Sequence, residues 1–548
     1  MTLGKRGAAI SVFRKGAAAL TPRRVLYLLM ALALVLRVVS VLAREMIQLD
    51  QTVYAHMAES LAGGYGPRDI TGVTSTNFLP TFPFFIAGLA AVFQDYVLSG
   101  YIVTVTFGVL LLVPVYLLGK ELVGEKVGLM AAALVAVDPY LVDLSTQLYS
   151  ESMFMFFVLL AILFSRHMVR GCRVPCSILA GSALGFAYLV NPTALIYLAL
   201  FVLVALFTAL RRGVWGHMVR ALAVFLISFS VYAAPLVLYL HSEMGGWNVS
   251  GKNPVLVYSA GESVRGGTIG WDQRFMAVSA GGDEVYVNDL GDDYPGPALY
   301  LLEDPERSAR TFLQQADIFY DEQLEQVFPR WLLPLVALGL FSAGWSRRQA
   351  AGAGFLLLMM SPALMLFFID AVPRYFIPYT PLLMIWAAQG WLRLEDWSRE
   401  TLGLNLEGRR RERLLGAAPA LVALAVTLPL LLATPLRFAR DSYPLAAREV
   451  GERIERAYGP GQRVMSREFS TAYYAGGEAV LFPYDDYDRV TEYARAQGVD
   501  LLVVGGNDIS YWRTPMARLL EDGGHPEWEL TDVAGEGDGE WRVYRFSG

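Results

Sequence analysis

The chain has 548 residues, of which 55% are hydrophobic and 18% are charged, and its formal net charge is −6. A soluble protein of this length would carry fewer apolar and more charged residues, so this composition excludes one. Several apolar runs reach the roughly 20 residues that are needed to cross a bilayer. The two cysteines do not imply a disulfide framework. We therefore predict a polytopic membrane protein.

A basic segment precedes the first apolar run. Residues 1–24 contain Lys5, Arg6, Arg14, Lys15, Arg23 and Arg24. Such a flank places the N-terminus in the cytoplasm. The run at 25–43 is too long for the apolar part of a signal peptide, and no small-residue cleavage site follows it. We predict that this run is a retained membrane span.

Windowed hydropathy predicts about eleven spans. They are expected at 25–43, 98–118, 127–142, 150–168, 176–189, 193–210, 218–240, 329–345, 351–369, 375–392 and 414–433. With the N-terminus in the cytoplasm, each loop after an even-numbered span is also cytoplasmic, and all of these loops are basic. Their basic residues include Lys120, Lys126, Arg166, Arg170, Arg173, Arg211, Arg212, Arg220, Arg347, Arg348, Arg393, Arg409, Arg410, Arg411 and Arg413. Hydropathy and charge are independent signals, so their agreement supports this topology.

Three longer segments, at 44–97, 241–328 and 435–548, are then predicted outside, and we expect the chemistry on that side. In the first of them, 52–61 has helical spacing and 78–93 is apolar and aromatic. At about 16 residues, 78–93 is short for a crossing, so we expect it to lie in the membrane interface. If it crosses instead, the inside–outside alternation fails from the second span onward.

The last outer segment has shorter apolar runs. Strands are predicted at 463–466, 479–482, 501–504, 529–533 and 541–546, and amphipathic helices are predicted at 445–457, 487–497 and 511–521. The glycines after 501–504 do not form the dinucleotide fingerprint, so we expect no Rossmann cofactor site. The predicted fold is an α-helical polytopic membrane domain, 1–434, followed by a small extracytoplasmic α/β domain, 435–548.

Asp50 and Tyr54 follow the first span at the membrane boundary. They are four residues apart, so a helix would place both side chains on one face. A carboxylate at this boundary is costly unless it has a function or a partner. Asp50 is therefore a candidate catalytic group, but it could equally cap a helix at 51–61.

Two further acids lie at the outer ends of predicted spans. Glu151 opens the span at 150–168, and Asp143 follows the span at 127–142. Either could act with Asp50 on a metal or on an acceptor. The alternative is again structural, because Glu is favoured in the first turn of a helix.

Arg374 and Tyr375 begin a late span, after a short outer turn that contains Asp370. An arginine at a boundary between water and lipid can bind phosphate through its bidentate fork. The alternatives are snorkelling to the interface and an ion pair with Asp370.

The order of these residues resembles a known family. A first span is followed by Asp50-x-x-x-Tyr54, a proline-containing amphipathic stretch, Ser150-Glu151-x-x-Phe154, Arg374-Tyr375-x-x-Pro378 and an outer α/β domain. Over about residues 24–433 this pattern resembles the prokaryotic GT-C membrane glycosyltransferases of family 39, grouped with protein O-mannosyltransferases and aminoarabinose transferase. Many relatives have a second acid directly after the first-loop aspartate, whereas this chain has Gln51 after Asp50. This difference weakens the case for a metal held by two adjacent carboxylates.

The resemblance implies transfer of a sugar from a polyprenyl-phosphate carrier to an acceptor outside the plasma membrane. It implies Asp50 as the catalytic aspartate, the acid Glu151 as a further catalytic residue and Arg374 near the carrier phosphate. Tyr54, Arg374, Tyr375 and Asp143 are expected to help bind substrate. The acceptor is expected to be a lipid, a glycan or a protein. No nucleic acid partner is expected, and a divalent metal remains an alternative.

The chemistry agrees with this assignment. A departing alkyl phosphate needs its charge stabilised by an arginine or a metal. The acceptor hydroxyl needs a general base such as Asp50, and direct displacement would invert the anomeric carbon.

Two other functions stay open. A transporter or flippase of lipid-linked sugars would favour charges within spans, broken helices and paired repeats, whereas the charges here lie at the outer rim. A non-catalytic envelope assembly protein would use its outer domain to bind partners.

Overall fold

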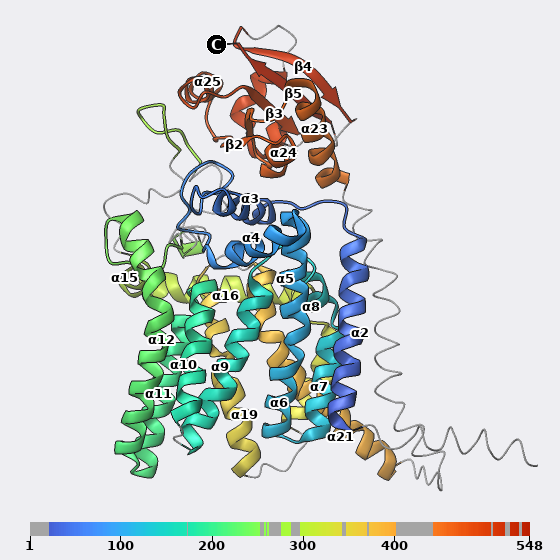
Figure 1. Ribbon diagram of the computed structural model, residues 1–548, viewed down its shortest axis with the longest axis vertical. Coiled ribbons are helices and arrows are strands. Elements are labelled where there is room, and N and C mark those ends of the chain that lie inside the picture. The colour runs from blue at the N-terminus through green and yellow to red at the C-terminus, as the bar shows by residue number, and fades with distance from the viewer. Residues whose placement is uncertain are drawn as a thin grey trace, which may run out of the picture.

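The computed structural model has a bundle of long helices with a small α/β domain above one end (Figure 1). The structure describes residues 21–171, 174–252, 257–258, 260–261, 276–285, 296–341, 347–369, 372–401, 442–505, 508–520, 526–535 and 540–547. The fold class predicted from the sequence is confirmed. The predicted span at 414–433 and the predicted domain boundary at 434/435 lie outside the described residues.

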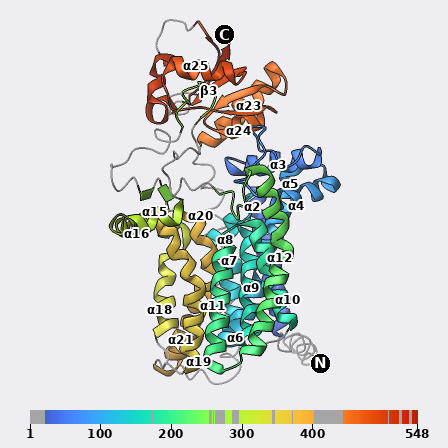
Figure 2. The same ribbon diagram turned by 90° about the vertical axis from the view of Figure 1, so that its left-hand side faces the viewer.

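The bundle helices run between its two ends (Figures 1 and 2). They are α2 (Pro22–Leu42), α5 (Tyr96–Leu110), α6 (Leu112–Leu122), α7 (Glu125–Val137), α9 (Glu151–Gly171), α10 (Val174–Val190), α11 (Ala194–Arg212), α12 (Trp215–Met244), α18 (Leu333–Phe341), α19 (Arg347–Met360) and α21 (Thr380–Thr401). In the described part of the chain, six helices are long and apolar enough to cross a membrane. The number becomes seven if the pair Pro305–Val327 and Arg330–Phe341, bent by 92°, is one span. The count of about eleven spans stays a prediction.

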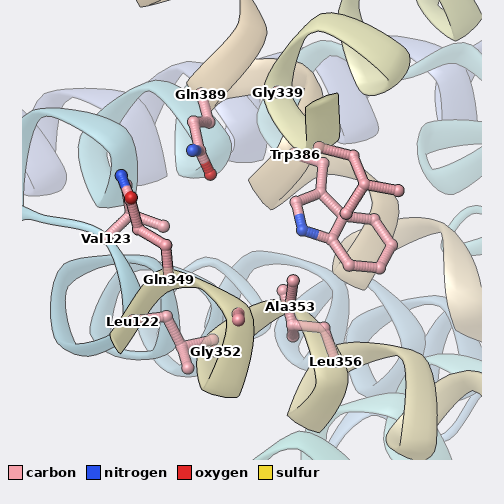
Figure 3. Close-up of a pocket in the computed structure, with 11 residues that line it drawn as sticks. Leu122, Val123, Gly339, Gln349, Gly352, Ala353, Leu356, Trp386 and Gln389 are labelled. Carbon is pink, nitrogen blue, oxygen red and sulfur yellow. The ribbon is translucent and has the colours of Figure 1, made fainter. Parts of the chain in front are cut away.

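Glycines bring α18 and α21 into close contact. A Cβ at Gly339 would lie 2.0 Å from the carbonyl oxygen of Trp386, and one at Gly390 would lie 1.8 Å from that of Leu335. Small residues allow the backbones of membrane helices to approach closely. Beside this crossing, a cavity of about 30 Å³ is lined by Trp386, Gln389 and residues of α6 and α19 (Figure 3). It has room for only about two water molecules, so it is not a substrate site.

The predicted span at 127–142 is broken in the structure. Helix α7 ends one residue before Asp138, and α8 (Pro139–Leu144) begins directly after it. Pro139 has no N–H and disfavours helical geometry in the residue before it, so the helix stops there. Asp138 caps α8 by accepting hydrogen bonds from two backbone N–H groups, at 3.1 and 2.9 Å.

A layer of shorter helices lies across one end of the bundle (Figure 1). Helices α3 (Asp50–Ala62) and α4 (Thr81–Phe93) lie across this end of the bundle and are not parallel to the long helices. This direction agrees with the expectation that the stretch at 78–93 does not cross the membrane. The predicted helix at 52–61 is confirmed by α3. The other short elements are α15 (Pro297–Glu303), α16 (Pro305–Ile318), η1 (Phe319–Gln323), α17 (Leu324–Val327), η2 (Arg330–Leu332), η3 (Ser361–Phe368), α20 (Pro373–Phe376) and η4 (Ile377–Tyr379).

The C-terminal domain contains a five-stranded sheet with the order β2-β1-β3-β5-β4. The strands are β1 (Arg463–Ser466), β2 (Glu478–Leu481), β3 (Leu501–Gly505), β4 (Trp528–Ala534) and β5 (Trp541–Phe546). Strands β1, β2 and β3 are parallel, and β4 and β5 are antiparallel to their neighbours. All five predicted strands are confirmed, each within one residue at either end.

Helices cover both faces of this sheet. They are α23 (Ser442–Tyr458), α24 (Phe469–Tyr474) and α25 (Tyr487–Ala496). Along β3, Leu501 and Val503 belong to the apolar cluster with α23, whereas Leu502 and Val504 belong to the one with α25. This is the alternation that a strand buried on both faces requires. The α-helix predicted at 511–521 was wrong, because this stretch holds the end of the π-helix η5 (Asp508–Trp512) and the 3-10 helix η6 (Thr514–Leu520). Pro515, the second residue of η6, has no N–H to donate to a continuous α-helix.

The domain packs directly on the helix layer beneath it (Figure 2). Val53 and Ile70 are buried in the same apolar cluster as Val464 and Ala479 of the domain. The carbonyl oxygen of Ile70 also accepts a hydrogen bond of 2.9 Å from the backbone N–H of Ala479, at the edge of the sheet. The membrane part and the C-terminal domain therefore share a core directly above α3.

Candidate active site

Asp50 is the first residue of α3, immediately after a sharp turn of the chain. The turn is made by Leu49, whose φ of 47° is rare for a side chain of this size. Strained backbone of this kind persists only where its surroundings hold it, and it is common at functional sites. Leu49 is the N-cap residue, so Asp50 does not cap the helix.

The Asp50 carboxylate contacts Arg374 instead. Arg374 Nη2 donates a hydrogen bond of 2.5 Å to Asp50 Oδ2, across 324 residues of sequence. Arg374 lies in α20, which the fold brings beside the start of α3. Asp370, which the sequence suggested as an ion-pair partner of Arg374, lies outside the described residues.

Arg374 lies between two carboxylates. Its Nε atom is 3.9 Å from Oε1 of Glu151, the first residue of α9. The guanidinium also lies over the rings of Tyr149, at 4.9 Å, and Tyr375, at 5.4 Å. The side chains of Asp50 and Arg374 are 27% and 28% exposed and that of Glu151 is 12% exposed. The structure thus brings Asp50, Glu151, Arg374 and Tyr375 into one partly accessible cluster, which we call the acid–arginine cluster.

Two atoms of the acid–arginine cluster have unused hydrogen-bonding capacity. Within the described residues, Glu151 Oε2 and Arg374 Nε are buried and have no hydrogen-bond partner. Buried polar atoms are nearly always paired in folded proteins. The cluster therefore offers an acceptor and a donor to a ligand that carries both.

Tyr54 lies beneath the acid–arginine cluster, one helical turn after Asp50. Its Oη atom is 3.4 Å from Ser150 Oγ, and its ring packs edge to face against Phe78 and Phe82. Burial raises the pKa of the Tyr54 phenol, so this group stays neutral. Its contacts hold the start of α3 against α4 and the start of α9.

Asp143 lies outside the acid–arginine cluster. It forms an ion pair of 2.7 Å with Arg44 and accepts a hydrogen bond of 2.8 Å from Gln147. Gln147 in turn accepts a hydrogen bond of 3.3 Å from Gln51, which is next to Asp50 in the chain. The position of Asp143 is therefore explained by these contacts, and its use in substrate binding stays a prediction.

Lys252 is a basic residue near the acid–arginine cluster that the sequence analysis missed. Its Nζ atom is 5.7 Å from the centre of the Phe78 ring. Lys252 as a whole residue is exposed. Desolvation of its ammonium group nevertheless lowers the pKa of Lys252, although the nearby carboxylates of Asp50 and Glu151 oppose this shift. The only signal in the sequence was the scarcity of lysine in a chain whose basic residues are nearly all arginine.

The Lys252 loop is fixed against the layer of short helices. A Cβ at Gly251 would lie 2.1 Å from the carbonyl oxygen of Thr76, so only glycine allows this approach. Tyr188 of α10 donates a hydrogen bond of 2.7 Å to the carbonyl oxygen of Val249. These contacts hold Lys252 near the acid–arginine cluster, although Lys252 is far in sequence from the residues of that cluster.

The acid–arginine cluster does not fit a divalent metal. The positive guanidinium of Arg374 already contacts both carboxylates, so a divalent cation held by the two acids would have to displace it. Across the parts of the chain that the structure describes, no group of three or more His, Cys, Asp and Glu side chains could hold an ion.

Comparisons with known proteins give one family match and several structural matches. Residues 78–237 match the family model described as dolichyl-phosphate-mannose-protein mannosyltransferase. This segment includes Glu151 but neither Asp50 nor Arg374. No curated protein sequence matches the chain.

The structural matches extend over most of the chain. The crystal structure of ArnT from Cupriavidus metallidurans, bound to undecaprenyl phosphate, has a TM-score of 0.58 at 13% identity, over 94% of this chain and 97% of that one. The Archaeoglobus fulgidus oligosaccharyltransferase in complex with Zn and sulfate has a TM-score of 0.53 at 14% identity, over 87% of this chain and 68% of that one. At these identities the likeness shows the fold. With the family match, it confirms the resemblance that the sequence motifs predicted.

Proposed function

We propose that this chain transfers a sugar from a polyprenyl-phosphate carrier to an acceptor. The premise is that the chain has the GT-C fold and a segment that matches the family 39 mannosyltransferases. The observation that carries this proposal is the acid–arginine cluster at the end of the bundle below the α/β domain. A cation held between two acids suits a reaction in which a phosphate leaves and a hydroxyl loses its proton.

Asp50 is the proposed general base. Its carboxylate, which accepts a hydrogen bond from Arg374, takes the proton of the acceptor hydroxyl as the hydroxyl oxygen attacks the anomeric carbon. The bond from that carbon to the phosphate oxygen breaks, and its electron pair leaves with the polyprenyl phosphate. Because attack and departure occur on opposite faces of the carbon, the configuration inverts.

Arg374 is the proposed ligand of the carrier phosphate. A guanidinium has five N–H donors, so it can donate to Asp50 and to a phosphate together. The negative charge on the phosphate grows as the sugar departs, and a fixed cation stabilises this transition state more than the ground state. Glu151 lies near Nε of the guanidinium and leaves Oε2 for a hydroxyl of the sugar. Tyr54, Tyr375 and Asp143 are proposed to shape the substrate site.

The proposed donor is a polyprenyl phosphate that carries a hexose or a pentose. The ArnT structure holds undecaprenyl phosphate, and the matching family model is named for dolichyl-phosphate-mannose. We propose a lipid, a glycan or a protein as the acceptor on the extracytoplasmic face. The basic loops at the other end of the bundle support this orientation, with a cytoplasmic N-terminus.

Replacing Asp50 with Asn tests the proposal. The isosteric amide cannot take the proton, and we expect transfer to fall by about 10² to 10⁴. Mass spectrometry of envelope lipids, glycans and glycoproteins from cells that express each variant measures the transferred sugar. Asp95→Asn is the matched control, because Asp95 caps α5 by accepting the Leu98 N–H at 2.9 Å and Asn caps equally well. Transfer at the normal rate by the Asp50→Asn protein would show that Asp50 is not the base.

A further inference from the structure

We propose that a cavity at the end of the bundle opposite Asp50 binds the phosphate headgroup of an anionic glycerophospholipid. The cavity has a volume of about 310 Å³ and lies between α9, α11 and α19. It is within the size range of small-molecule sites. The acid–arginine cluster lies at the other end of the bundle, where α3 and α20 are found (Figure 2). This cavity is therefore separate from the proposed donor site.

Three arginines give the cavity a positive charge. Arg166, Arg170 and Arg212 all line it. Glu121 lies 3.7 Å from Arg166 and also contacts His167, so this acid is already shared. Arg170 and Arg212 form no ion pair with any carboxylate that the structure describes. The lining therefore carries uncompensated positive charge, which favours an anionic ligand.

The remaining lining is apolar and aromatic. Phe201, Phe355 and Met359 form part of the wall, and the guanidinium of Arg166 lies 5.0 Å from the centre of the Phe355 ring. Phe207, another lining residue, is 60% exposed on the outer surface of α11. A headgroup between the arginines would thus continue into acyl chains along an apolar surface. A free phosphate ion would leave this apolar part of the site unused.

The predicted topology supports this ligand. By the charge of its loops, this end of the bundle faces the cytoplasm, where the leaflet is rich in anionic lipids. Basic pockets between membrane helices on this side commonly bind the head groups of such lipids. We therefore identify phosphatidylglycerol as a suitable probe for the site.

Native mass spectrometry of the full chain in detergent tests the site with added phosphatidylglycerol, phosphatidylcholine or polyprenyl phosphate. The wild type should retain phosphatidylglycerol in preference to the other two. The double variant Arg170→Gln/Arg212→Gln should bind it about thirty-fold more weakly, since each basic residue near a membrane surface contributes about a factor of five. The control Arg23→Gln/Arg24→Gln removes the same charge at the same end of the bundle, from exposed positions of α2. It should bind like the wild type.

A second variant tests the cavity without changing its charge. Val204→Trp fills the space between the arginines and should also release the lipid, and a thermal melt of the protein without added lipid checks that it folds. Equal loss of lipid in the α2 control would show that general surface charge is responsible. Equal retention of phosphatidylcholine, or preference for polyprenyl phosphate, would equally overturn the proposal.

Discussion

Arg374 joins the two acids of the acid–arginine cluster. Two carboxylates held close together repel each other, and a guanidinium between them removes most of this cost. Lysine could supply the charge but not the planar fork, which has several donors in fixed directions. The site therefore needs an arginine at this position.

Arg374→Gln should lower the transfer rate by at least about 100-fold, because a donor to the leaving phosphate is lost in the transition state. Arg374→Lys should recover part of the rate. Steady-state kinetics with the lipid-linked donor would measure kcat and KM separately. Arg310→Gln is the control, because Arg310 pairs with Glu306 on an exposed turn of α16, away from the acid–arginine cluster. An unchanged kcat in Arg374→Gln would contradict the proposed role in stabilising the departing phosphate.

We expect Lys252 to make the proposed transfer depend on pH. Desolvation lowers its pKa, so it loses its proton below the ordinary lysine value of about 10.4. Below the lowered pKa the acid–arginine cluster has a second cation nearby, and above it this cation is absent.

We therefore expect the transfer rate to fall on the alkaline side at a pH below about 10.4. Lys252→Arg keeps its charge throughout, so its alkaline limb should move to higher pH. Rate profiles between pH 6 and pH 11 would measure this. Lys120→Arg, which changes an exposed lysine paired with Glu125 at the other end of the bundle, should leave the profile unchanged. The same limb in wild type and Lys252→Arg would exclude Lys252 as its source.

At the scale of elements, the position of α20 depends on how α21 is packed, because α20 and η4 lead directly into α21. Contact between α21 and α18 is set by Gly339 and Gly390, which bring the two backbones together. Such contacts hold membrane helices together where no hydrophobic driving force acts between them.

Gly390→Ala should therefore destabilise the bundle. The added Cβ would meet the Leu335 carbonyl oxygen at 1.8 Å, which forces the helices apart and should cost about 1–3 kcal/mol. Thermal unfolding in detergent would measure the loss. Gly354→Ala is the control, since a Cβ at Gly354 in α19 has no neighbour within 4 Å. Equal melting temperatures for the two variants would contradict this packing.

At the scale of the whole molecule, the outer domain and the membrane part share one apolar core. Ile70 is completely buried in that core and lies between α3 and α4. The contact places the domain over the helix that begins with Asp50. The contact therefore helps to position α3, which begins with Asp50, and it also stabilises the domain.

Ile70→Asp should separate the domain from this layer, because burying an unpaired charge costs on the order of several kcal/mol. Hydrogen exchange at residues 44–80 would detect the separation as faster exchange. Val73→Asp makes the same change in the same loop at a position that is 63% exposed, so it should have little effect. If both variants exchange at the wild-type rate, the shared core does not hold the domain in place.

The sequence by itself determined the class of the molecule. Long apolar runs and basic loops required a membrane bundle, and the short alternating runs after residue 460 predicted every strand of the outer sheet within one residue. These features follow from local patterns, because hydropathy and side-chain alternation act over neighbouring residues. The motifs around Asp50, Glu151 and Arg374 also singled out three side chains that the structure brings into one cluster, and their roles stay predictions.

Only the tertiary structure decided how these residues meet. It paired Asp50 with Arg374 across 324 residues, gave Asp143 a separate partner in Arg44, and brought Lys252 close to the acids. It also broke the predicted third span at Asp138, although Pro139 had already provided a local signal. Ion pairs between distant residues depend on how helices pack, and packing is a property of the assembled bundle that no short stretch of sequence contains.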